Sequence, residues 1–145
     1  MPRVGGASPS DPISPGVTAG PAVKALRGPG GFQPVMDAGS AARHGPFRVH
    51  LLRRGDGRPH VQLGIGVAKR RVARATARNR LKRHVRESAR AHAAHLQGLD
   101  LVVFVVEQAA QTLTPDELRS TLQRLWEKGL KSLTRDPRQS PGRSP

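Results

Sequence analysis

Residues 68–90, AKRRVARATARNRLKRHVRESAR, decide how this chain is read, because they gather much of its positive charge in one segment. Ten of the 25 Lys and Arg residues lie here, and Glu87 is the only acid. The segment lacks Pro and Gly and is rich in good helix formers. It therefore predicts a helix over most of its length, continuing to about Leu96 and ended by Gly98.

The predicted helix has one narrow apolar stripe and one cationic face. At about 100° per residue the stripe holds Ala77, Leu81, Val85 and Ser88. The opposite side holds Arg78, Asn79, Lys82, Arg83, Arg86 and Arg90. Like charges at i, i+4 repel, so this ladder costs stability unless a polyanion faces it. Phosphate is the polyanion that best matches forked Arg donors.

Two other readings of this helix remain open. The first is a basic face that only keeps the protein in solution. The second is a membrane-surface or calmodulin-type helix, which needs a broad apolar face with Trp or Phe. The thin stripe of Ala, Leu and Val does not favour the second reading.

Composition points to a nucleic-acid partner and to one domain. The chain has 145 residues, a net charge of +15 and a pI near 11.9. The absence of Cys excludes disulfides and Cys-based zinc sites. No apolar span or signal-like N-terminus is present, so we expect a cytoplasmic protein without a membrane partner. Only four aromatic residues are available to stack on bases.

The ends of the chain differ from its middle. Residues 1–31 are rich in Pro, Gly, Ser and Ala, which predicts a disordered N-terminal extension. Residues 132–145 predict a disordered polar C-terminal tail for the same reason. Residues 32–131 remain for one folded domain.

The middle segment alternates helical and strand patterns. Residues 32–38 predict a short helix that stops at Gly39, and residues 47–53 a half-buried strand. Residues 60–68 predict a strand in which Gly64 and Gly66 suggest close approach by another backbone or a ligand. The apolar run 101–106 predicts a strand buried on both faces. A capping box at Thr114 opens a last amphipathic helix.

This order predicts an α+β fold. We expect a single small domain with a mostly antiparallel sheet, helices packed on it and a split-βαβ arrangement. The acids are scattered singly, so the sequence indicates neither a catalytic residue nor a metal site in the protein.

The basic segment, with AKRRV at residues 68–72, ARNRLKR at 77–83 and RES at 86–88, resembles the "RNR" signature of the protein subunit of bacterial ribonuclease P. Residues 32–39, 63–68, 100–103 and 117–126 resemble other elements of the same family, so residues 32–131 are covered. The resemblance implies a ribosomal-protein-like fold with an unusual left-handed βαβ crossover.

The resemblance also implies a function. Members of the family are protein cofactors of a catalytic RNA that removes the 5′ leader of precursor tRNA. The RNA and its Mg²⁺ ions carry out the endonucleolytic step, and the protein holds no cofactor of its own. The expected partners are therefore ribonuclease P RNA and precursor tRNA, without DNA, and the protein alone is not expected to cleave.

Matched positions imply two sets of site residues. Those expected to bind RNA are Lys69, Arg70, Arg71, Arg74, Arg78, Asn79, Arg80, Lys82, Arg83 and Arg86. Those expected to form a cleft for the single-stranded leader are Phe32, Met36, Phe47, His50, Gly64 and Gly66. For Phe32, Met36 and Phe47, ordinary packing in the core is an equal alternative. Met36 and His50 stand where the family often has aromatic residues, and Glu107 stands where it often has a basic one.

An alternative function, from a different class, is a structural rRNA-binding or ribosome-associated protein that has the same layered α+β fold. Only the ribonuclease P subunit needs a preference for a single strand 5′ of a tRNA. A self-sufficient nuclease is disfavoured because no acid cluster is present. For the basic helix we predict that Arg78→Ala or Arg86→Ala weakens RNA binding and leaves folding intact.

Overall fold

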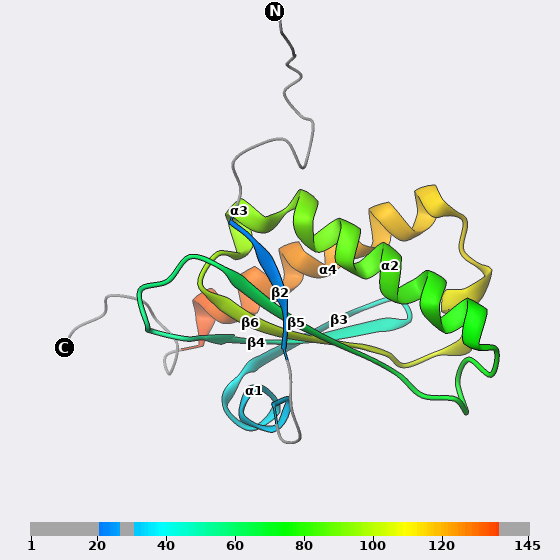
Figure 1. The fold of residues 1–145 in the computed structure, drawn as a ribbon, viewed down its shortest axis with the longest axis horizontal. Helices are drawn as coiled ribbons and strands as arrows, with labels where there is room; N and C mark the ends of the chain where they lie inside the picture. The colour runs from blue at the N-terminus through cyan, green and yellow to red at the C-terminus, as the bar shows by residue number, and fades with distance from the viewer. Residues whose placement is uncertain (1–20, 27–30, 137–145) are drawn as a thin grey trace, which may run out of the picture.

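The described part of the computed structural model, residues 21–26 and 31–136, forms one five-stranded sheet with helices on both faces. Helices α2 and α4 cover one face, and the short helix α1 lies on the other (Figure 1). The strands follow the order β2-β5-β6-β4-β3 across the sheet. In chain order the elements are β2 (Val23–Ala25), α1 (Gln33–Ala38), β3 (Ser40–His44), β4 (Phe47–Arg53), β5 (Val61–Val67), α2 (Ala75–Ala91), α3 (Ala93–Leu96), β6 (Leu99–Val105), the 3₁₀ helix η3 (Gln108–Thr112) and α4 (Pro115–Arg135).

The layered α+β architecture is as predicted, but the sheet is mixed and not mostly antiparallel. The β2–β5 and β5–β6 pairings are parallel, whereas β6–β4 and β4–β3 are antiparallel. The additional parallel pairing comes from β2, which lies inside the segment predicted to be disordered. There the Val61 N–H donates to Ala22 O at 2.9 Å, and the Leu26 N–H donates to Leu63 O at 3.0 Å.

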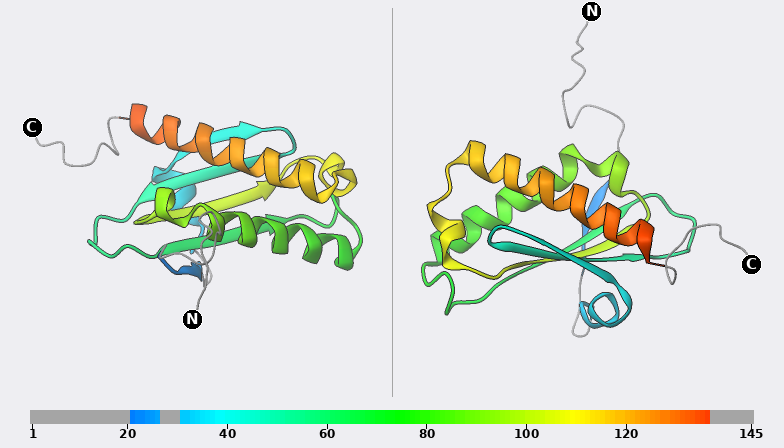
Figure 2. Two further views of the ribbon diagram at one scale, coloured as in Figure 1. Left: turned by 90° about the horizontal axis from the view of Figure 1, so that it is seen from above. Right: turned by 180° about the vertical axis from the view of Figure 1, so that it is seen from behind.

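The connection β5–α2–β6 is the left-handed crossover that the resemblance implies. Figure 2, in its left view, looks down on α2 and α4 with the sheet behind them. In that view α2 lies between the reader and the sheet, and both parallel strands run in the same direction. For a reader who follows that direction, β6 lies to the left of β5. This is the rare hand for a parallel crossover, so general rules alone predict the opposite hand.

The predicted domain limits need correction at both ends. Strand β2 belongs to the folded domain, and α4 continues to Arg135, beyond the predicted limit at residue 131. Burial explains the second shift, because Leu133 is 1% exposed. The Ser40 hydroxyl also donates to Asp136 Oδ2 at 2.8 Å and fixes the end of α4 beside β3. The remainder of both predicted disordered segments lies outside the described residues.

The basic segment 68–90 is a loop followed by a helix, and not one helix. Residues 69–71 form a turn, and α2 begins only at Ala75. The chain must reverse direction after β5 in order to cross back over the sheet. The fully buried Val72 anchors the loop that makes this reversal. Helix α2 ends at Ala91, and α3 follows as one separate turn before Gly98, whose φ of +78° favours Gly.

The sequence patterns missed β3 and η3. Strand β3 has the sequence SAARH, which lacks large apolar residues, and its register comes from pairing with β4. Helix η3 is a single 3₁₀ segment with one buried residue, Ala110. Neither has the periodic apolar pattern on which sequence reading depends.

The core lies between the sheet and the α2–α4 layer. Alternation along β4 directs Phe47, Val49 and Leu51 into it, all with no exposed surface. Helix α4 begins with the predicted capping box at Thr114 and is joined to α2 by Trp126. The Trp126 Nε1–H donates to the buried Ser88 Oγ at 2.8 Å. The core therefore fixes the position of α2, whose other side carries the cations.

Candidate nucleic-acid interface

The loop before α2 carries the first group of cations. Lys69, Arg70, Arg71 and Arg74 are all exposed. The loop is held from inside, since the N–H groups of Arg71 and Val72 both donate to Ala68 O, at 2.9 and 3.0 Å. A buried valine and a tight turn thus present four cationic side chains to solvent.

Helix α2 continues this surface. Asn79, Arg83 and Arg86 are exposed, and Lys82 is half-buried. Within residues 21–26 and 31–136, none of the ten cations of the basic segment forms an ion pair with a carboxylate. The face is not neutralised from within, so its charge is available to an external polyanion.

Two of the predicted RNA-binding residues are engaged inside the protein. Arg78 Nη1 donates to Val72 O at 3.0 Å and to Ala73 O at 2.8 Å, which ties α2 to the preceding loop. Arg80 Nη2 donates to Leu113 O at 2.9 Å and joins α2 to the segment before α4. The expectation that Arg78→Ala leaves folding intact is therefore weakened, and Arg86 is the cleaner position for such a test.

A groove of about 250 Å³ brings the two predicted sets together at the β2 edge of the sheet. Lys82, Arg86 and Arg90 of α2 form one wall, and Phe32 and Gly64 contribute to the other. Residues 23–26, Leu63 and Ile65 complete the lining. With Lys24 of β2, the groove combines four cations with an aromatic ring, which suits a phosphate and its attached base.

Aromatic rings line the sheet face opposite α2 and α4. The Phe32 and Phe104 centroids are 6.4 Å apart in an edge-to-face arrangement. His50 meets Phe104 in the same way at 5.9 Å, and the Arg48 guanidinium lies 5.9 Å from the Phe104 centroid. Phe104 was not predicted, because a continuous apolar run hides which side chains face outward. The available signal was that side chains alternate along a strand, which places Phe104 on the face opposite the buried Val103.

The two strand glycines make room for these rings. A Cβ on Gly64 would lie 2.3 Å from Phe32 Cε1, and one on Gly66 would lie 2.7 Å from Phe104 Cδ1. The glycines were expected to allow close approach by another backbone or a ligand, but the protein's own rings occupy that space. Any ligand on this face meets Phe32 and Phe104 first.

Phe47 does not belong to the cleft surface. It has no exposed area and points into the core beside Val49 and Leu51. Side chains alternate along a strand, so Phe47 and His50 lie on opposite faces of β4 and cannot line the same cleft. Met36 is 37% exposed on α1, so it is not a core residue, and its assignment to the cleft stays a prediction.

His50 is an unusual member of the aromatic face. Both of its ring nitrogens are buried, and neither has a hydrogen-bond partner among the residues that the structure describes. Burial lowers the pKa of His50 below its ordinary value, and the positive charge of Arg48 lowers it further. His50 therefore sits in the sheet as a neutral ring.

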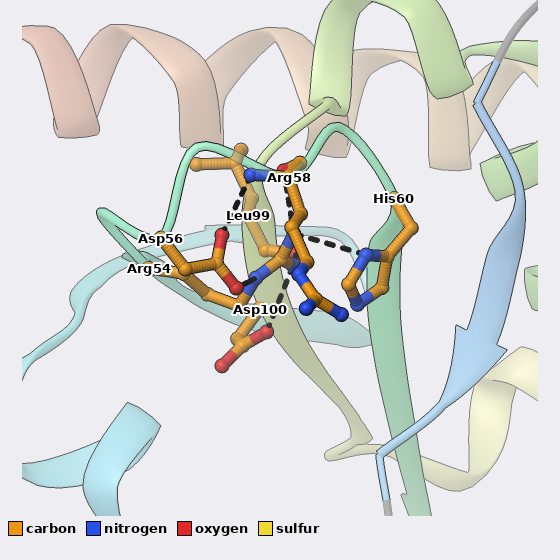
Figure 3. Close-up of polar contacts among 6 residues, drawn as sticks. All are labelled: Arg54, Asp56, Arg58, His60, Leu99 and Asp100. Carbon is orange, nitrogen blue, oxygen red and sulfur yellow. Dashed lines mark hydrogen bonds and ion pairs between the residues drawn. The ribbon is translucent and has the colours of Figure 1, made fainter.

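Beyond the aromatic face, the β4–β5 loop is shaped by one guanidinium (Figure 3). The Arg54 side chain, 7% exposed, pairs with Asp56 Oδ2 at 3.1 Å and with Asp100 Oδ1 at 3.2 Å. It also donates to the backbone oxygens of Leu99 and Arg58, at 3.2 and 2.8 Å. Its charge is satisfied within the protein, so this cluster organises the loop and leaves RNA contact to other residues.

Neither a metal site nor a membrane span is found in the described ranges. No three His, Asp or Glu side chains there converge closely enough to hold a metal ion. No helix within those ranges is long and apolar enough to cross a bilayer.

Fold and surface together define the class: a small α+β domain with an unneutralised cationic loop and helix beside an aromatic sheet face has the form of an RNA-binding domain. The sequence profile of the Ribonuclease P family matches residues 21–129. The chain therefore belongs to the bacterial ribonuclease P protein family.

Individual relatives agree with this assignment. The chain is 37% identical over 122 residues to the ribonuclease P protein component of Ectopseudomonas mendocina, covering 83% of this chain and 90% of that protein. It is 46% identical over 78 residues to the component of Pseudoalteromonas atlantica, covering 54% of this chain and 64% of that protein.

Solved structures agree as well. The ribonuclease P protein of Staphylococcus aureus matches with a TM-score of 0.64 and 25% identity, over 71% of this chain and 92% of that one. The protein of Thermotoga maritima matches with a TM-score of 0.56 and 28% identity, over 65% of this chain and 86% of that one.

Proposed function

We propose that this protein is the cofactor of a ribonuclease P ribonucleoprotein, in which it binds the catalytic RNA and the 5′ leader of precursor tRNA. The observation that carries the proposal is the groove at the β2 edge, which Lys82, Arg86 and Arg90 line together with Phe32. Membership of the family supplies the class of substrate.

In this proposal the cationic loop and the outer face of α2 bind the phosphates of the catalytic RNA. Arg71, Arg74, Arg83 and Arg86 are exposed and can form forked contacts, while Asn79 adds a neutral donor and acceptor. Arg78 and Arg80 act as positioning residues that hold this surface in place through backbone carbonyls.

The leader is proposed to follow the groove onto the aromatic face. Its phosphates lie near Lys82 and Arg86, and its bases stack on the accessible sides of Phe32 and Phe104. Stacking tolerates any base, and it contributes about 1–3 kcal/mol per base in proteins that bind single strands. The proposed contacts therefore do not require a particular leader sequence.

The cleavage step is assigned to the RNA subunit with its Mg²⁺ ions. The protein lowers the electrostatic cost of bringing two polyanions together, which matters most when Mg²⁺ is scarce. The protein by itself is then a binding subunit of a cytoplasmic holoenzyme.

Cleavage of 5′-labelled precursor tRNA at low Mg²⁺ tests the proposal, with the protein alone, a bacterial ribonuclease P RNA alone, and both together. We expect cleavage at the mature 5′ end only when both are present. The matched variants are Arg86→Gln, which alters the groove, and Arg58→Gln, which removes the same charge from an exposed loop position.

A protein that binds the RNA tightly without enhancing cleavage would contradict the cofactor role and favour a structural RNA-binding protein. Equal binding of precursor tRNA and mature tRNA would contradict the assignment of the groove to the leader. Cleavage by the protein alone would overturn the division of roles.

A further inference from the structure

A second row of cations lies on α4, far from the surface discussed so far. The row consists of Arg124, Lys128, Lys131 and Arg135, at spacings i, i+4, i+7 and i+11. These spacings place the four side chains on one side of the helix. At 1.5 Å per residue the row is about 16 Å long, enough to face several phosphates of one strand.

The row is exposed, and its four cations outnumber the two acids beside it, Glu127 and Asp136. All four side chains are exposed, and none forms an ion pair with a carboxylate within residues 21–26 and 31–136. Glu127, the acid in the middle of α4, lies about 100° around the helix from Lys128, but it neighbours Arg124 at i, i+3 and Lys131 at i, i+4, and it accepts from Gln123. The like-charged pairs Arg124–Lys128 and Lys131–Arg135, each at i, i+4, still carry an electrostatic cost in the isolated protein.

The row borders a groove against the edge strand β3. Lys128, Lys131 and Arg135 line an open groove of about 530 Å³ together with Asp136, and Ala41 and Ala42 form its other wall. The Ser132 hydroxyl donates to Ala41 O at 3.1 Å and holds this part of α4 against the strand. Because the alanine side chains are small, the charged groups dominate the groove: its three cations exceed the one Asp136 carboxylate, which accepts from Ser40, so the groove is net positive.

His44, at the end of β3, reports the positive potential of this region. Partial burial lowers the pKa of His44 below its ordinary value, and the charges of Lys128 and Arg124 lower it further. The cations of α4 thus act on the end of β3 that lies beside them.

The α4 row and the α2 surface lie at opposite edges of the sheet. The groove with Lys82 and Arg86 includes β2, whereas the groove with Lys128 and Lys131 includes β3. Strands β2 and β3 are the two edges of the five-stranded sheet, about 19 Å apart at the usual strand spacing. The left view of Figure 2 shows α4 running along the β3 side and α2 along the β2 side.

We propose that the α4–β3 edge is a second RNA-binding surface, which holds the phosphate backbone of a separate segment of the ribonuclease P RNA. This inference rests on the proposed function. The RNA subunit is favoured over the leader because the leader surface lies at the β2 edge and on the opposite sheet face. A protein with cations at both edges clamps two RNA segments about one domain width apart.

Directed cleavage tests the proposal cleanly, because the chain contains no Cys. An iron–EDTA probe is attached to single cysteines in the reconstituted holoenzyme with bound precursor tRNA. Lys131→Cys reports on the α4 row and Arg83→Cys on α2. Gln123→Cys, which faces the groove between α2 and α4, is the control on the same helix. We expect Lys131→Cys and Arg83→Cys to cleave two different segments of the RNA subunit, with only background from Gln123→Cys.

A charge test accompanies the probe. Lys128→Gln/Lys131→Gln should weaken binding of ribonuclease P RNA about tenfold at physiological salt and reduce the slope of log K against log salt by roughly 2. The matched control Arg58→Gln/Arg119→Gln removes two charges elsewhere and should change neither. Thermal melting of both double variants checks that folding is intact.

The outcomes separate the two proposals. Cleavage of the RNA subunit from Arg83→Cys but not from Lys131→Cys overturns the second surface and leaves the proposed function in place. Cleavage of precursor tRNA instead of the RNA subunit from Lys131→Cys overturns the choice of partner. An unchanged affinity and salt slope in Lys128→Gln/Lys131→Gln also overturns the second surface. Absence of cleavage from both α2 and α4 overturns this inference and the proposed function together.

Discussion

At the scale of single residues, Gly64 controls the position of Phe32. We predict that Gly64→Ala displaces the ring, because the added Cβ would lie 2.3 Å from Phe32 Cε1. The strain should lower the free energy of unfolding by about 1–2 kcal/mol and weaken binding of precursor tRNA more than binding of mature tRNA. Melting curves and the two affinities measure these effects.

A second substitution separates strain from loss of the ring. Gly64→Ala/Phe32→Leu should recover stability, because the smaller side chain makes room for the Cβ, yet it should bind precursor tRNA as weakly as Phe32→Leu alone. Recovery of tight precursor binding in the double variant would show that the Phe32 ring is not a leader contact.

His50 gives a prediction for pH. Its pKa is lowered in the folded protein, so the unfolded chain takes up the proton more readily. The stability that depends on neutral His50 is present above the ordinary pKa of about 6.5 and is lost as the pH falls below it. We predict that His50→Phe is more stable than the parent protein at pH 5.5, by a margin that shrinks towards pH 8.

The orphaned ring nitrogens add to this effect at every pH, by up to about 1 kcal/mol, because a phenyl ring carries no polar atom that needs a partner. Thermal melts at pH 5.5 and 8 measure both contributions. An equal difference at the two pH values would show that protonation of His50 does not limit stability.

Residue roles were the part of the site that sequence reading predicted least well. Phe47 and His50 both matched cleft positions, but strand alternation places them on opposite faces. Phe104 was missed because its strand is apolar throughout, and burial is decided by which helix covers which face. Arg78 and Arg80 have the same side-chain chemistry as Arg83, and only the fold shows that their donors reach backbone carbonyls.

At the scale of elements, the β4–β5 loop depends on Arg54. We predict that Arg54→Ala lowers the free energy of unfolding by about 3 kcal/mol, because it leaves Asp100 and two backbone oxygens without their donor. Arg58→Ala is the matched control in the same loop, since Arg58 takes part through its backbone N–H and C=O.

Arg58→Ala should change stability by less than about 0.5 kcal/mol. Denaturant unfolding of the two variants makes the comparison. Similar effects from both substitutions would mean that net charge in the loop, and not the bonds of Arg54, determines its stability.

Elements with a complete local signal were predicted well, and the others were not. Strand β4 was predicted at its observed limits, Phe47–Arg53, and α4 begins at the predicted capping box. Strands β2 and β3 are short and carry few large apolar residues, so their neighbours in the sheet supply their register. The break before α2 escaped detection because the need to reverse direction after β5 is a property of the topology.

At the scale of the whole molecule, the two basic edges should contribute independently to RNA binding. Their separation of about 19 Å exceeds the Debye length of about 8 Å at physiological salt, and among the described residues the two grooves have no lining side chain in common. We predict that the binding free-energy losses of Arg83→Gln/Arg86→Gln and Lys128→Gln/Lys131→Gln add within about 0.5 kcal/mol in the quadruple variant.

Titrations of ribonuclease P RNA with the parent protein, both double variants and the quadruple variant complete this cycle at fixed salt. Repeating it at low salt provides an internal control, because the Debye length of about 30 Å at 0.01 M then spans both edges and coupling should appear. If one continuous RNA segment wrapped around a single edge, the second pair of substitutions would cost little once the first was present. Additivity at physiological salt together with coupling at low salt is the pattern that a two-edged clamp requires.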